Sequence, residues 1–72
     1  MQGTWIKYTP SDNTTEIFNL DKATRFRHVE SPNEAFIEVH ADGAVHMITR
    51  INDPEAYQIV LRYIEQKTGF AL

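Results

Sequence analysis

The chain has 72 residues and no cysteine, which fits one domain over residues 1–72 and excludes disulfide bonds and cysteine-based sites. Its net charge of −3 is unlike the basic composition that is typical of nucleic-acid-binding domains. The longest apolar run, Ile59-Val60-Leu61, is too short for a membrane span or a signal-peptide core, so we expect a soluble cytoplasmic protein. A domain of this size has a thin margin of stability and gains from an efficient core or a partner chain.

Clusters of Pro, Gly, Asn and Asp divide most of the chain into short segments in which apolar and polar side chains alternate. Loops of hairpin length join these segments, so we expect an antiparallel β-meander. The expected strands are Thr4–Thr9, Thr15–Leu20, Ala23–Glu30, Ala35–Ala41 and Ala44–Asn52.

The loop around Asp42-Gly43 can align its two strands in two ways. A two-residue loop pairs Val39 with His46 and mixes polar and apolar side chains on both faces of the sheet. A three-residue loop, which also includes Ala41, pairs Val39 with Val45 and separates the two kinds of side chain more cleanly. Because a slip of one residue moves every side chain to the opposite face, we predict the three-residue loop.

A four-residue loop at Ser31–Glu34 completes the predicted register, because it places Phe26 opposite Val39 and Arg27 opposite Glu38. The sheet then has two distinct faces. The apolar face is expected to carry Phe26, His28, Ile37, Val39, Val45, Met47 and Ile51. The opposite, basic face is expected to carry Arg25, Arg27, Phe36, Glu38, His40, His46, Ile48 and Arg50.

One C-terminal helix follows the strands, so the predicted class is α+β. Asp53 is a favourable N-cap, Pro54 suits the first helical position, and Gly69 suits the residue that ends a helix. Apolar side chains cover a wider arc of this helix than the stripe of about 100° that a surface helix shows. At the centre of this arc, Val60 and Ile64 are expected to be buried against Ile37, Val39, Val45 and Met47.

The flanks of this wide apolar arc need cover that one sheet face does not provide. The tail over residues 69–72 could supply part of the cover, and a second subunit could supply the rest. Our leading hypothesis is therefore a non-enzymatic interaction module that forms a homodimer or binds a protein partner. The residues expected at or near the dimer contact are Ile59, Tyr63 and Phe70.

The basic sheet face supports an alternative hypothesis, a domain that binds single-stranded nucleic acid. Cations neutralise phosphates and aromatic rings stack on bases in such domains. Trp5 and Lys7 would strengthen the site if their strand placed them on this face, which the sequence does not decide. The residues expected to bind nucleic acid are Arg25, Arg27, Phe36, His40 and Arg50.

Glu38, His40 and His46 are of the residue types that bind zinc and related metals. A fourth strong ligand is lacking and Arg27 lies beside the group, so we expect no metal and no cofactor. His28, on the apolar face, is expected to form a hydrogen bond with a nearby backbone group.

No pattern in the sequence points to catalysis. The two serines, Ser11 and Ser31, lie in predicted turns whose composition explains them. The chain has no glycine-rich loop that could hold a phosphate. A domain of this size also has little room for a deep pocket of about 300 Å³ or more. We therefore expect a protein that is not an enzyme.

Overall fold

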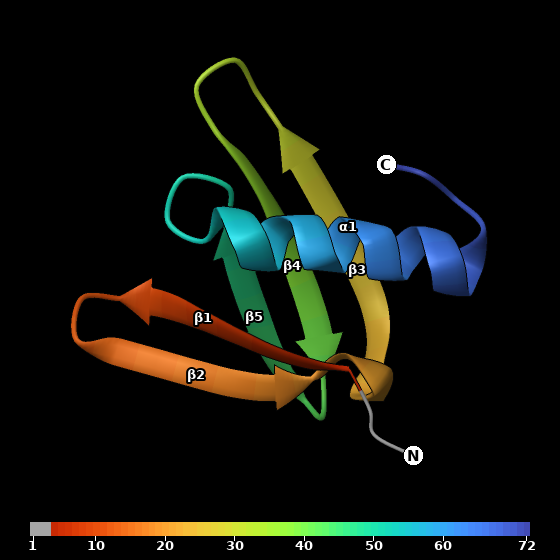
Figure 1. Ribbon diagram of the computed structural model, residues 1–72, viewed down its shortest axis with the longest axis horizontal. Helices are drawn as coiled ribbons and strands as arrows, with labels where there is room; N and C mark the ends of the chain where they lie inside the picture. Colours follow the sequence, from red (N-terminus) through yellow and green to blue (C-terminus); the bar gives the residue numbers. More distant parts are fainter. Residues whose placement is uncertain (1–3) are drawn as a thin grey trace.

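The computed structural model describes residues 4–72 and shows five antiparallel strands followed by one α-helix (Figure 1). This confirms the predicted α+β class. None of the helices in these residues is long and apolar enough to cross a membrane. The elements are β1 (Trp5–Ser11), β2 (Thr14–Asn19), the 3-10 helix η1 (Leu20–Lys22), β3 (Ala23–Glu30), β4 (Ala35–Ala41), β5 (Ala44–Thr49) and α1 (Pro54–Thr68).

The strands form two sheets and not the single meander that the sequence predicted. β1 and β2 form a separate hairpin, and β3, β4 and β5 form a three-stranded sheet in that order. The break lies at η1, where the side chain of Asn19 accepts a hydrogen bond of 2.9 Å from the Asp21 N–H. α1 crosses one face of the three-stranded sheet, and β1 contacts both α1 and β5 (Figure 1).

The register of β3 on β4 is the predicted one, with Phe26 opposite Val39 and Arg27 opposite Glu38. Ser31 and Glu34 exchange backbone hydrogen bonds of 2.7 and 3.3 Å. The loop is therefore shorter than the predicted four residues and consists of Pro32 and Asn33.

The predicted three-residue loop between β4 and β5 is wrong. Ala41 pairs with Ala44, so that Asp42 and Gly43 form a two-residue turn with φ angles of 52° and 77°. Two positive φ angles are typical of a type I′ turn, whose twist matches that of the flanking strands. The turn shifts β5 by one residue, which moves His46 and Ile48 to the helix side and Val45 and Met47 to the other side.

The core lies between α1, the inner face of the hairpin and the helix side of the three-stranded sheet. Val60 and Ile64 are buried there, as predicted, in a cluster that includes Ile37 and Val39. The cluster contains Ile48 in place of Val45 and Met47. The predicted inclusion of Ile51 is also wrong, because β5 ends at Thr49. The buried apolar residues are Ile6, Tyr8, Phe18, Leu20, Ala35, Ile37, Val39, Ala41, Ile48, Ala56, Tyr57, Val60 and Ile64.

The two ends of α1 differ in how closely they follow the sequence prediction. Gly69 ends the helix with φ 82°, and its N–H bonds to the Glu65 carbonyl, as expected. Asp53 holds the N-cap position, but its side chain does not cap the helix. Its carboxylate accepts hydrogen bonds of 3.2 Å from the Thr9 N–H and 3.1 Å from the Thr9 hydroxyl. Asp53 therefore joins α1 to β1.

Candidate functional site

The face of the three-stranded sheet opposite α1 is called the open face. Its side chains mix charge with exposed apolar groups, since Val45 is 56% and Met47 is 46% exposed. An antiparallel sheet commonly has one solvated face, so this arrangement alone assigns no function. From the strand registers, the open face carries Arg25, Arg27, Val29, Phe36, Glu38, His40, Val45, Met47 and Thr49.

Four of the five residues expected to bind nucleic acid lie on the open face, and Arg50 does not. The Arg50 N–H bonds to the Ala35 carbonyl at 3.0 Å, which continues the register and places Arg50 on the helix side. Arg27 and His40 lie 3.5 and 3.8 Å from the carboxylate of Glu38. The three arginines therefore form no continuous stripe, and nucleic-acid binding stays a prediction.

The three residues considered as metal ligands are divided between the two faces. Glu38 and His40 lie on the open face, whereas the shift of β5 places His46 in the core. Within residues 4–72, no group of three or more His, Cys, Asp or Glu side chains has a geometry that could hold a metal ion.

His46 belongs to a buried polar cluster that joins the hairpin to the three-stranded sheet. Its Nδ1 lies 3.0 Å from the Tyr8 hydroxyl and 3.3 Å from the Glu16 carboxylate, and the Phe18 ring stacks on it at 3.9 Å. Burial, followed by the Glu16 carboxylate, raises the pKa of Tyr8 to about 12. Of these residues, Tyr8 also lines a groove beside β1. This cluster was not predicted, because the expected register of β5 placed His46 on the opposite face.

Two tyrosines join α1 to the chain on the β3 side. The Tyr57 hydroxyl lies 2.8 Å from Nε2 of His28, so the partner of this histidine is a side chain and not the expected backbone group. The Tyr63 hydroxyl donates a hydrogen bond of 2.7 Å to Asp21. That bond lowers the pKa of the Asp21 carboxyl. Burial and the same bond raise the pKa of Tyr63 to about 12.

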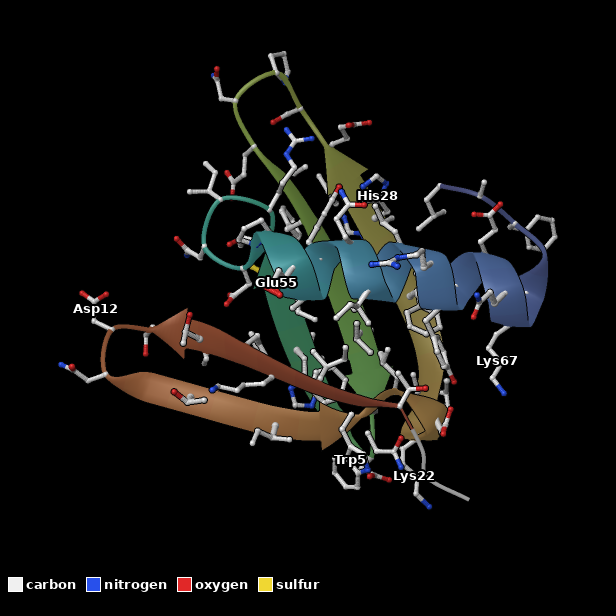
Figure 2. All side chains as sticks on the ribbon, in the orientation of Figure 1. Trp5, Asp12, Lys22, His28, Glu55 and Lys67 are labelled. Carbon is white, nitrogen blue, oxygen red and sulfur yellow. The ribbon has the colours of Figure 1, made fainter. Side chains whose placement is uncertain are left out.

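A groove of about 620 Å³ lies between the beginning of β3 and the end of α1, and is called the β3 groove. Figure 1 shows why it exists: the C-terminal end of α1 extends beyond β3, the last strand on that side of the sheet. Figure 2 shows Lys67 on this overhanging end. The apolar residues that line the groove are Ala23, Phe26, Tyr63, Ile64, Phe70 and Leu72.

The outer edge of β3 carries unpaired backbone groups. In an antiparallel pair, residues that exchange hydrogen bonds alternate with residues that do not. Ser31 and Glu34 exchange bonds, so the same pattern directs the N–H groups of Arg25, Arg27 and Val29 toward β4. The N–H and carbonyl groups of Phe26 and His28 therefore point away from the sheet.

A second groove, of about 500 Å³, lies between β1 and the first half of α1 and is called the β1 groove. Trp5 and Lys7 lie on its β1 wall, and Pro54, Glu55 and Ile59 lie on its helix wall. Figure 2 shows Glu55 at the start of α1, at the end of the helix opposite Lys67. Both grooves exceed the volume of about 300 Å³ that we did not expect in so small a domain. They are open to solvent and do not form deep pockets.

The three residues expected at a dimer contact are thus divided between two grooves along α1, although Ile59 and Tyr63 also line one smaller hollow with Arg62. Ile59 lines the β1 groove, whereas Tyr63 and Phe70 line the β3 groove. The tail does not cover the helix as expected, since Phe70 is 72% exposed. Trp5 and Lys7 lie on the outer face of the hairpin, away from the open face. No local pattern predicts either groove, because both depend on where α1 lies on the sheets.

Comparisons of the chain with protein families, curated proteins and solved structures find no match. The function is therefore inferred from the geometry of residues 4–72.

Proposed function

We propose that this protein is a small non-enzymatic interaction module that forms a homodimer through the β3 edge and the β3 groove. The observation that carries the proposal is the overhang of α1 beyond an edge strand whose outer backbone groups are unpaired. An edge strand of this kind is a template for pairing with another chain. A cytoplasmic location stays a prediction.

A second copy of the chain would pair with the free edge of β3 and also fill the space beneath the overhang of α1. Two β3 strands that pair in antiparallel fashion would join two three-stranded sheets into one sheet of six. The two-fold axis would then be perpendicular to the sheet, and both helices would lie on the same face. The overhanging end of each α1 would lie above the strand added by the other copy. The apolar side chains of the β3 groove, Phe70 among them, would then be covered.

Two-fold symmetry also explains why one patch is sufficient, because the same surface serves both subunits. In addition, pairing gives hydrogen-bond partners to the outward N–H and carbonyl groups of Phe26 and His28. Tyr63 and Phe70 remain at the contact, whereas Ile59 does not line the β3 groove and is no longer part of it.

Sedimentation equilibrium at micromolar concentration tests the proposal. The wild-type chain is expected to have the mass of two chains, and Phe70→Asp the mass of one. Ile51→Asp is a matched control, because Ile51 is 73% exposed, like Phe70 at 72%, and does not line the β3 groove. A wild-type mass of one chain at every concentration would contradict the proposal, and so would equal loss of the dimer in both variants.

Hydrogen exchange locates the contact within the dimer. The amides of Phe26 and His28 are expected to exchange slowly at high protein concentration and rapidly on dilution. Arg27 provides the control, because its N–H faces β4 and is expected to stay protected at both concentrations. A dimer in which the Phe26 and His28 amides stay unprotected would place the contact elsewhere.

A further inference from the structure

The β1 groove combines a free strand edge with an adjoining helix. The Leu20 N–H bonds to the Thr4 carbonyl at 2.7 Å, so alternation turns the N–H and carbonyl groups of Trp5 and Lys7 away from β2. The Thr9 N–H, next in this series, bonds to Asp53 at the start of α1. The same edge of β1 therefore faces the helix, and its groups at Trp5 and Lys7 have no hydrogen-bond partner within residues 4–72.

We propose that the β1 groove binds a short extended peptide segment, which adds a third strand to the hairpin and carries an acidic side chain beside Lys7. Addition of a peptide to a strand edge obtains its affinity from backbone hydrogen bonds and its specificity from alternate side chains. This site is separate from the proposed dimer contact, because the β1 groove lies at the first half of α1 and the β3 groove at its C-terminal end.

The groove limits the length of its occupant. The bonds from Thr9 to Asp53 close one end, so a segment can pair with β1 only from Lys7 toward Thr4. About two residues of β1 thus have backbone groups available for pairing. This number suits a segment of a few residues and not the edge of a whole sheet. A second copy of the domain fits the open β3 edge better.

The alternation of side chains defines where the residues of the segment would lie. Residues directly opposite Trp5 and Lys7 would have their side chains on the outer face of the hairpin, next to these two side chains. The residues between them would point toward the helix wall, where Ile59 is 39% exposed. The site therefore favours apolar side chains at the inward positions.

The charges around the groove favour an acidic residue at the outward position. Among the ion pairs of residues 4–72, none involves Lys7 or Arg62. Arg62 lies with Thr4 and Ile59 at the open end, whereas the two carboxylates of the groove, Asp53 and Glu55, lie at the closed end, where Asp53 is bonded to Thr9. Opposite charges facing each other across two strands stabilise the pairing. A carboxylate beside Lys7 would complete such a pair.

Titration with synthetic peptides tests the proposal, and Trp5, the one tryptophan of the chain, reports binding by its fluorescence. The probe is a capped hexapeptide of alternating valine and glutamate, and its control has lysine in place of glutamate. The acidic peptide is expected to change the emission of Trp5 in a saturable way and to shift the amide resonances of Lys7 and Ile59. No saturable change with the acidic peptide would overturn the proposal.

Two N-methylated peptides distinguish strand addition from binding that does not use backbone hydrogen bonds. Methylation of the glutamate amide nitrogens, which would face β1, is expected to abolish binding. Methylation of the valine amide nitrogens, which would face away, is expected to preserve it. Equal binding of both peptides would overturn the proposed mode.

Variants of the chain test the charge and the location. Lys7→Glu is expected to weaken the acidic peptide about fivefold and to strengthen the lysine peptide by a similar factor. Phe70→Asp, in the β3 groove, is the control that should leave both affinities unchanged. Unchanged affinities in Lys7→Glu, or loss of binding in Phe70→Asp, would contradict a site in the β1 groove.

Discussion

The two ends of α1 show how one helix can leave two different strand edges unpaired. On the β1 side, Asp53 bonds to Thr9 and closes one end of the groove. On the β3 side, Tyr63 bonds to Asp21 while the helix continues past the sheet. A groove that is closed at one end suits a short segment, and an open edge beneath an overhang suits a second copy of the sheet. In both proposals, the position of the helix relative to each edge, and not the edge alone, therefore selects the expected partner.

The largest expected effect on the free energy of unfolding comes from the centre of the apolar face of α1, and the flank of that face is expected to contribute less. Ile64 is 3% exposed in the core, whereas Ile59 is 39% exposed at the β1 groove. Ile64→Ala is expected to lower the free energy of unfolding by about 2–5 kcal/mol, because it leaves a cavity. Ile59→Ala should cost less than about 1.5 kcal/mol, since only part of the side chain leaves an apolar contact. Chemical denaturation at a fixed protein concentration measures both, and similar losses would show that the core extends over the flank.

A smaller effect on the free energy of unfolding is expected from two tyrosine hydroxyls that bond to histidines. Tyr8→Phe removes the hydroxyl beside His46, and Tyr57→Phe removes the one beside His28. We expect a loss of about 1–2 kcal/mol for Tyr8→Phe and less for Tyr57→Phe, because the bond of Tyr8 is more deeply buried. The raised pKa of Tyr8, about 12, means that its contribution is full below pH 10 and is lost as the pH rises through 12. Equal losses at neutral pH would show that the deeper burial of the Tyr8 bond adds nothing to its contribution.

The bond that closes the β1 groove is expected to have a moderate effect. Asp53→Ala removes both bonds to Thr9 and should lower the free energy of unfolding by about 1 kcal/mol. Thr9→Val keeps the backbone N–H and should cost about half as much. Faster amide exchange at Thr9 in Asp53→Ala alone would confirm that the side chain closes the groove. No change in that exchange would mean that the groove is open at both ends.

The smallest expected effect concerns Asp21 and Tyr63 on the β3 side. Because the pKa of Asp21 is lowered in the folded state, its bond stabilises the fold above the ordinary aspartate pKa. This contribution is lost as the pH falls through the lowered value. Tyr63→Phe should therefore lower the melting temperature slightly at pH 7, and the difference from the wild type should shrink in acid. A difference that does not depend on pH would assign the effect to lost packing instead.

Local patterns were sufficient for the elements and for one of the two registers in the three-stranded sheet. Alternation and turn residues predicted all five strands, and the turn at Ser31–Glu34 fixed the pairing of β3 with β4. Pro54 and Gly69 marked the two ends of α1. Proline lacks the N–H group that a first helical residue does not need, and glycine readily adopts the positive φ angle that ends a helix. The buried positions Val60 and Ile64 followed from the helical period.

The tertiary structure decided everything that depends on partners distant in the sequence. His46 looked unsuitable for the core until Tyr8 and Phe18, from the hairpin, supplied its contacts, and β5 took the register that the Asp42-Gly43 turn favours. Asp53 had the sequence of a helix cap, but Thr9 is its partner. Both grooves arise in the same way, because the path of α1 across the sheets is set by the combined core and by no local segment.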